Sequence, residues 1–214
     1  MTCNHGCHGS HQGACGSQRV GNGVVNCKNF GPFNAIDAAC IVPPRNTGSI
    51  IPFSSGTIPA SLATLATGLV STTSAIGFGT SVPGITIVGN TITLGGTLPS
   101  EAFTVPRDGS ITALSATFVT TAAVALLTGP TTIRAQIYRA PQGSTTFTAT
   151  NVFVDLVPPI PAPIAIGAIA TGNASFAPVP VSVGDRLLMV FSATTSTAVA
   201  ATIVGNAAAG ITIE

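Results

Sequence analysis

Short runs rich in Val, Ile and Thr alternate with Gly- and Pro-rich turns from residue 46 to residue 214. Residues branched at Cβ favour strands, whereas Gly and Pro favour turns. The clearest unit is ITIVGNTITL at residues 85–94, where a turn at Gly89 and Asn90 would set Ile87 opposite Ile92. That register also places Ile and Leu together on one face, so the sequence predicts a β-hairpin here.

Other runs have the same character, and the number and spacing of the runs predict an antiparallel β-sandwich or jelly roll. Further strands are expected at residues 102–105, 110–120, 132–139, 146–156, 164–170, 186–193, 198–204 and 211–213. In the third of these runs, Arg134, Gln136 and Tyr138 share one face. One short helix is expected over residues 59–69, because leucines recur at helical spacing after a proline suited to a first turn. The fold class predicted is therefore all-β, an antiparallel jelly-roll sandwich with one short helix.

The reactive residue types are confined to the beginning of the sequence. All five cysteines, all three histidines and the only lysine precede residue 41, and Pro43 and Pro44 form a stiff hinge soon afterwards. We therefore divide the chain into a Cys/His-rich N-terminal connector tail, residues 1–45, and a jelly-roll trimerisation domain, residues 46–214. The second part is called the body below.

The body carries few charges for its size. Charged residues make up 6% of the chain, against about 25% in ordinary soluble proteins. The runs VFVDLV and RLLMVF are apolar on both faces, which predicts that part of the body surface is buried between subunits of an oligomer. The alternative is that Thr and Ser hydroxyls solvate an unusually uncharged surface.

Several function classes are disfavoured by these residue types. A net charge of +1 gives no electrostatic reason to expect a nucleic-acid partner. The longest apolar stretch, residues 156–170, contains four prolines, so no membrane segment is expected. The body has no Cys, His or Lys to form a nucleophile–base pair, and Asp108 and Asp185 stand in turn sequences. We expect neither enzymatic activity nor a cofactor.

The tail permits two chemical interpretations besides a reduced, flexible segment. The first is disulfide cross-linking through all of its cysteines, Cys3, Cys7, Cys15, Cys27 and Cys40. The second is a metal site, for which the candidate ligands are Cys3, His5, Cys7, His8, His11 and Cys15. The tail lacks the paired C-x2-C units of ordinary structural zinc sites. Because the body has no cysteine, any disulfide joins tail to tail, and an odd number of cysteines leaves one that is free or bonded to another chain.

The second half of the tail is apolar but too short to form a core. Its apolar side chains are Phe30, Phe33, Ile36, Ile41 and Val42. We expect this segment to dock on a neighbouring subunit. A tail that docks on a neighbour makes a head-to-tail contact, and such contacts generate filaments when they do not close into a ring.

Several motifs of the body, in order, resemble the C-terminal domain of the BclB-type exosporium collagen-like glycoproteins. These are SIIPFSSG at residues 49–56, IPASLATLATG at 58–68, AIGFG at 75–79, AFTVPRDGSITALSATF at 102–118, VPVSVGDRLLMVFSAT at 179–194 and the ending AAAGITIE. The resemblance covers essentially the whole body. That family is similar to the tumour-necrosis-factor-like jelly rolls, which form homotrimers. The resemblance implies a structural protein of the bacterial endospore surface, made in the mother cell without a signal peptide.

The resemblance also favours disulfides over metal in the tail, because spore-surface proteins meet oxidising conditions after the mother cell lyses. The resulting expectation is a homotrimeric, self-assembling subunit of a spore surface layer or appendage fibre, linked head-to-tail through its tail. Its partners would be further copies of itself and other spore-surface proteins at the fibre base or tip. The alternative is a trimeric tip module that presents loops to glycans or host surfaces.

Overall fold

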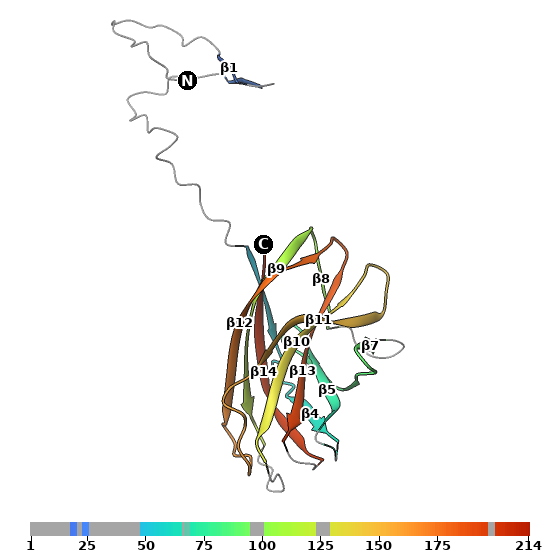
Figure 1. Ribbon diagram of the computed structural model, residues 1–214, viewed down its shortest axis with the longest axis vertical. Coiled ribbons are helices and arrows are strands. Elements are labelled where there is room, and N and C mark those ends of the chain that lie inside the picture. The colour runs from blue at the N-terminus through green and yellow to red at the C-terminus, as the bar shows by residue number, and fades with distance from the viewer. Residues whose placement is uncertain are drawn as a thin grey trace, which may run out of the picture. The chain divides into compact units, whose positions relative to one another are not determined.

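The computed structural model describes residues 18–20, 23–25, 48–65, 67, 69–94, 101–122, 129–196 and 200–214 (Figure 1). The chain divides into two units, Met1–Arg45 and Asn46–Glu214. In the first unit, β1 (Gln18–Val20) pairs antiparallel with β2 (Gly23–Val25). No helix in the described part of the chain is long and apolar enough to span a membrane.

The second unit is a network of strands whose ladders are all antiparallel. The strands are β3 (Ser49–Ser54), β4 (Ala60–Thr64), β5 (Val70–Ile76), β6 (Ser81–Thr86), β7 (Thr91–Thr93), β8 (Phe103–Thr104), β9 (Gly109–Thr120), β10 (Thr131–Ala140), β11 (Thr146–Asp155), β12 (Ile169–Val181), β13 (Arg186–Thr195) and β14 (Thr202–Ile213).

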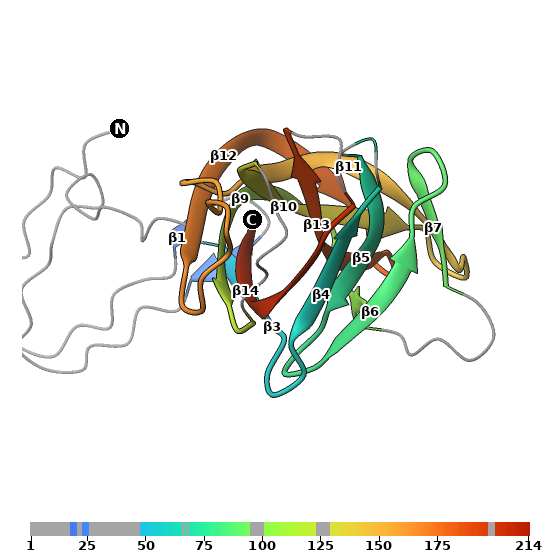
Figure 2. The ribbon, with the colours of Figure 1, turned by 90° about the horizontal axis from the view of Figure 1, so that it is seen from below.

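Eight of these strands form two sheets with the strand order of a jelly roll. The first sheet has the order β3-β14-β9-β12 and the second has the order β5-β13-β10-β11. β4 pairs with both β14 and β5, so it connects the two sheets along one edge. Figure 2 separates the layers, with β12, β9 and β14 on one side and β6 and β7 on the other. The predicted all-β, antiparallel jelly-roll class is confirmed.

The main core lies between the two sheets and follows the two-residue alternation of strands. Inward-facing residues of β9 and β14 meet those of β10, β11 and β13 in one cluster. Its largest fully buried side chains include Phe53, Leu62, Phe118, Ile133 and Phe191. The rings of Phe118 and Phe191 lie 6.3 Å apart, and they join the first sheet to the second across this core.

The predicted helix over residues 59–69 is wrong, and no described residue of that stretch is helical. Residues 60–64 form β4, where Ala60, Leu62 and Thr64 are buried in alternation. Leu65 and Leu69 are exposed instead of continuing an apolar helical face. The spacing of the leucines fits a helix in isolation, but β4 forms backbone hydrogen bonds with a strand on each side, and these pairings determine its conformation.

The predicted hairpin at residues 85–94 forms only at its turn. Val88 and Thr91 exchange backbone hydrogen bonds of 2.9 and 3.1 Å around Gly89, which has a φ of +62°. Beyond that bridge the strands separate, because β6 pairs with β5 and β7 pairs with β11. The predicted pairing of Ile87 with Ile92 is therefore wrong, although Ile92 is buried and Ile87 partly so in the same cluster.

Two long strands differ from the predicted ones. A strand was expected at residues 164–170, but β12 begins only at Ile169 and continues to Val181. Of the strand expected at residues 198–204, residues 202–204 belong to β14, and residues 198–199 lie outside the described residues. The strand expected at 211–213 is the end of the same strand, which passes through Gly205 and Gly210. A Cβ at Gly205 would collide with the Val119 carbonyl and the Phe118 ring, so this glycine allows the close approach of β9.

The end of β14 lies beside the start of β3. Ile213 is paired with Ser49, and a Cβ on Gly48 would lie 2.8 Å from the carbonyl oxygen of Ile213. Glu214 exchanges backbone hydrogen bonds with Ser110 on β9. The start and the end of the body therefore meet at one end of the first sheet.

Candidate functional site

The residues that sequence analysis assigned to cross-linking, docking or metal binding lie outside the described residues. They are Cys3, His5, Cys7, His8, His11, Cys15, Cys27, Phe30, Phe33, Ile36, Cys40, Ile41 and Val42. Within the described part of the chain, no group of His, Cys, Asp and Glu side chains is arranged to hold a metal ion. The candidate sites that can be described are therefore surfaces of the body.

The first sheet presents an outward face without a charged side chain among its paired residues, which we call the uncharged face. Strand pairing aligns its residues in rows across β3, β14, β9 and β12. The rows are Ser54, Ala208, Thr117 and Thr171; Pro52, Gly210, Ser115 and Asn173; and Ile50, Thr212, Ala113 and Ser175.

Small side chains leave the uncharged face shallow. Gly210, Ala113 and Ser115 border a hollow of about 440 Å³, in which Ile50 forms one wall. Ile50 is 75% exposed although it is a large apolar residue. A solvated sheet face ordinarily carries charged side chains, and the core of a protein–protein interface is depleted in them. The lack of charged side chains is therefore a feature that this face shares with interface cores, although interface cores contain less Ser and Ala than this face does.

The outward face of the second sheet is covered in part by the same chain. Leu188, Val190 and Tyr138 point outward from β13 and β10, and Val82, Ile85, Ile92 and Leu94 pack over them in a second apolar cluster. These covering residues belong to β6, β7 and the segments beside them. We call them the cover.

The cover corrects one argument made from the sequence. Leu187, Met189 and Phe191 of RLLMVF point into the main core, while Leu188 and Val190 lie under the cover. Both apolar faces of this strand are therefore buried within one chain. The strand gives no reason to expect a subunit interface.

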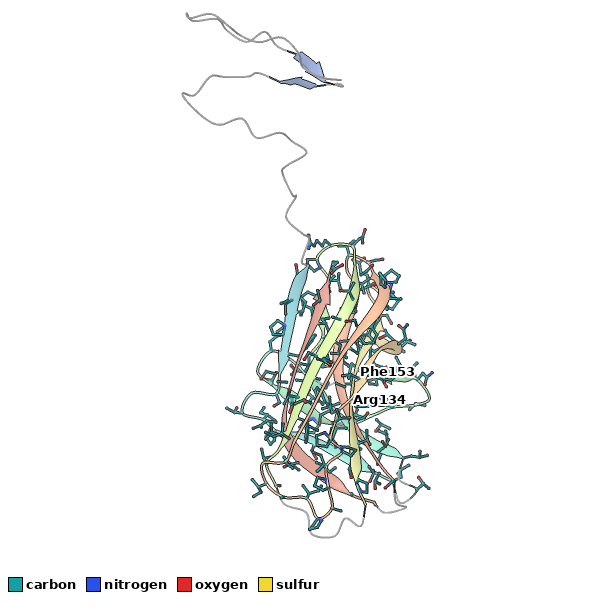
Figure 3. The ribbon with its side chains drawn as sticks, turned by 60° about the vertical axis from the view of Figure 1, so that its left-hand side comes forward. Arg134 and Phe153 are labelled. Atoms are coloured by element: carbon teal, nitrogen blue, oxygen red, sulfur yellow. The ribbon has the colours of Figure 1, made fainter. Side chains whose placement is uncertain are left out.

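The run VFVDLV behaves differently. Val152, Val154 and Leu156 point into the main core, whereas Phe153 is 37% exposed and Val157 is 61% exposed. Arg134 lies over the Phe153 ring, with its guanidinium carbon 4.3 Å from the ring centre (Figure 3). The outward face of this strand is therefore exposed and partly polar.

A groove of about 570 Å³ lies where the cover ends on the second sheet. Its floor consists of outward side chains of β10 and β13, and its other sides are contributed by β11, by the start of β5 and by the turn that follows β6. The lining residues are Leu69, Val70, Ile87, Gly89, Thr132, Arg134, Gln136, Tyr138, Asp155, Ser192 and Thr194. The two-residue alternation of this strand places Arg134, Gln136 and Tyr138 on one face, but no pattern in the sequence predicts a groove there.

The charged pair of the groove neutralises itself. The Arg134 Nε donates to Asp155 Oδ1 at 2.6 Å, and its Nη2 donates to Oδ2 at 2.8 Å. The hydrogen bond to Asp155 raises the pKa of Arg134, and partial burial opposes this increase. This bidentate pair links β10 to β11, because Arg134 and Asp155 lie directly opposite each other on the two paired strands.

Two hydroxyl groups of the groove belong to buried residues and form no hydrogen bond to any residue that the structure describes. They are those of Tyr138, which is 4% exposed, and Ser192, which is 8% exposed. Neither oxygen is fully buried, because in the described part of the chain only Thr131 Oγ1 is both fully buried and without a partner. Burial raises the pKa of Tyr138, and the nearby charge of Arg134 opposes that increase. Gln136 donates from Nε2 to the Thr150 carbonyl at 2.8 Å, which holds its side chain at a bulge of β11.

The two turn carboxylates have structural partners. Asp108 Oδ1 accepts a 2.8 Å hydrogen bond from the Val183 amide, and Asp185 Oδ2 accepts one of 2.7 Å from the Ser182 amide. Asp185 also pairs with Arg139 Nε at 2.8 Å. These contacts connect the PRDG turn to the VGDR turn at one end of the sandwich.

Two of the motifs that carry the resemblance lie side by side. Ser54 of SIIPFSSG and Phe78 of AIGFG form a parallel bridge, and the Phe53 and Phe78 rings stack with centres 5.5 Å apart. A Cβ at Gly56 would collide with the Gly79 backbone. The glycines of these motifs therefore serve close packing between two chain segments.

No family model matches the chain. The chain is similar to collagen-like protein 1 of Acanthamoeba polyphaga mimivirus, with 33% identity over 160 residues that cover 71% of this chain. It spans only 17% of the length of that protein. A solved structure, the Eiger TNF of S. frugiperda, matches this chain with 9% sequence identity and a TM-score of 0.38. The match covers 78% of this chain and 94% of the Eiger chain.

Proposed function

We propose that the chain is a structural, self-assembling protein whose body forms a homotrimer through the uncharged face. The uncharged face is the observation that carries this proposal. The cover already buries apolar side chains on the outward face of the second sheet, whereas the outward residues in the rows of the first sheet are exposed or half-buried. The similarity to a segment of a collagen-like protein supports a structural role.

The threefold stoichiometry and the location rest on the resemblance to the exosporium proteins. We propose a subunit of an endospore surface layer or appendage fibre, without enzymatic activity, whose trimers are linked head-to-tail by the tail. Residues 30–44 would dock on the neighbouring trimer, and tail cysteines would form disulfides between chains. Other spore-surface proteins at the fibre base or tip would be its further partners.

A single carboxylate in the uncharged face tests the trimer. We expect the full chain under reducing conditions to sediment as trimers and their multiples, and Ser115→Glu and Ala208→Glu to sediment as monomers at micromolar concentration. Each trimer would bury three copies of an unpaired carboxylate, and such burial costs several kcal/mol for each ion. Analytical ultracentrifugation measures the outcome.

The matched control is Thr86→Glu, because Thr86 is exposed on β6 and lies outside the uncharged face. This variant should remain trimeric. A monomeric wild type would contradict the proposed assembly. Trimers that persist in both Ser115→Glu and Ala208→Glu would show that the subunits associate through another surface.

A second experiment tests the tail. With all five cysteines replaced by Ser, we expect the covalent multimers seen on a non-reducing denaturing gel to disappear while trimers persist in native buffer. Each disulfide between chains stabilises the polymer by about 2–4 kcal/mol. Replacement of His5, His8 and His11 by Ala should leave the gel pattern unchanged. Monomer bands without reductant, together with stoichiometric zinc, would support the metal site instead.

A further inference from the structure

We propose that the groove on the second sheet binds an uncharged saccharide. The groove is open beside the end of the cover, and its volume of about 570 Å³ lies within the range of roughly 300–1,000 Å³ that is usual for small-molecule sites. It lies on the sheet opposite the uncharged face. The proposal therefore goes beyond self-assembly and does not depend on it.

The unpartnered hydroxyls are the first observation that indicates a ligand. Tyr138 and Ser192 line the groove, each is more than nine-tenths buried as a residue, and neither hydroxyl forms a hydrogen bond to any residue that the structure describes. Their oxygens still reach the groove, because Thr131 Oγ1 is the only fully buried side-chain oxygen without a partner in the described part of the chain. A ligand with its own hydroxyl groups would take the place of the water that bonds them.

The charge balance excludes most other ligand classes. The only charged side chains in the lining are Arg134 and Asp155, and they are paired with each other at 2.6 and 2.8 Å. Neither an anion nor a cation would find a free counter-charge there. The ligand that this lining favours is neutral.

The other lining residues supply both kinds of contact that a sugar ring makes. Leu69, Val70 and Ile87 contribute aliphatic surface that can contact ring C–H groups. On the floor of the groove, the side chains of Thr132, Thr194 and Gln136 offer hydroxyl and amide groups for ring hydroxyls. Gln136 is held by its hydrogen bond to the Thr150 carbonyl, so its side-chain oxygen is kept in place as an acceptor.

The test uses the full chain and the neutral methyl glycosides of glucose, galactose, mannose, rhamnose and N-acetylglucosamine as probes. Saturation-transfer-difference NMR should show binding of at least one of them with a dissociation constant in the millimolar range. Tyr138→Phe and Ser192→Ala should each weaken that binding about five- to tenfold, because each removes one hydrogen bond to the ligand. Neither hydroxyl has a partner in the described chain, so these variants leave no protein group unsatisfied.

Ser115→Ala is the matched control, because it removes a serine hydroxyl from the other sheet and should leave binding unchanged. If no glycoside binds, the saccharide proposal is overturned. If a glycoside binds equally well to Tyr138→Phe and Ser192→Ala, the groove is not its site. If inorganic phosphate or citrate binds in the groove and the glycosides do not, the neutral ligand class is wrong.

Discussion

The outward faces of the two sheets differ in how far the chain itself covers them. On the second sheet, Leu188 and Val190 point away from the main core and are nevertheless buried, because the cover folds back over them. On the first sheet, outward positions carry Ala, Ser, Thr and Gly, and Ile50 remains 75% exposed. An apolar pattern on both faces of a strand therefore predicts that both faces are buried. It does not indicate whether the same chain or another copy of the chain covers them.

The largest expected effect tests whether the cover forms a true core. Phe147 is fully buried in the second cluster, so Phe147→Ala should lower the free energy of unfolding by about 3–5 kcal/mol. Phe118→Ala in the main core should have a similar effect. Denaturant unfolding at one fixed protein concentration measures both.

Phe153→Ala is the control for that comparison, because Phe153 is 37% exposed on the uncovered part of the same strand. Its effect should be about 1 kcal/mol or less, as is usual for surface positions. Equal effects of Phe147→Ala and Phe153→Ala would mean that the cover adds no stability.

A smaller effect is expected at the turn of the cover. Gly89 has a φ of +62°, and a Cβ added there would have no neighbouring atom within 4 Å, so Gly89→Ala introduces backbone strain without a steric clash. We expect a loss of about 1–2 kcal/mol in the free energy of unfolding. Gly89→Asn should lose less, because Asn tolerates this conformation. If the two variants are equally stable, the turn does not hold this conformation in solution.

The smallest effect concerns the edge of the cover, where Tyr138 borders the groove. Tyr138 is the only tyrosine, so its ionisation can be followed by ultraviolet absorbance without interference. Burial raises its pKa above the ordinary value of 10.0, and Arg134→Met should raise the pKa further by removing a favourable positive charge. A folded-state pKa at or below the ordinary value would show that water reaches this side chain.

The same pKa shift has a defined effect on stability. Above pH 10, the unfolded chain loses the Tyr138 proton while the folded chain retains it, so the free energy of unfolding should fall as pH rises through the folded-state pKa. Well below pH 10 Tyr138 is protonated in both states, so it should not make the free energy of unfolding depend on pH there. Tyr138→Phe should lack this alkaline decrease. Denaturant unfolding of both proteins over this pH range provides the comparison.

The local sequence pattern predicts best those strands that contain no residue that is rare in strands. The expected strand at 132–139 lies within β10, and the one at 186–193 lies within β13. In both runs the apolar residues occupy the positions that are buried, on one face of β10 and on both faces of β13. β12 was mostly missed because it contains Gly172, Pro178 and Pro180, which are rare in strands. It lies at the edge of the first sheet, and Pro178 falls within a bulge, where no ladder hydrogen bond is required.

The surfaces were harder to predict than the strands, because they depend on contacts between distant segments. The sequence places Arg134, Gln136 and Tyr138 on one face, but the groove also needs Ser192 from β13 and Ile87 from the turn after β6. The failure of the predicted Ile87–Ile92 pairing has the same cause. Neither the pairing of β7 with β11 nor the resulting cover can be derived from a local repeat.

The adjacency of Gly48 and Glu214 has a consequence for protein engineering. Because Ser49 pairs with Ile213, a short linker could join the end of the body to its beginning, and new ends could be opened in a surface turn such as that at Gly143. The body could likewise be inserted into a loop of a host protein without separating the two sides of that loop. A cargo fused before residue 48 or after residue 214 would leave from the same end of the sandwich, so the opposite end would stay accessible in a displayed array.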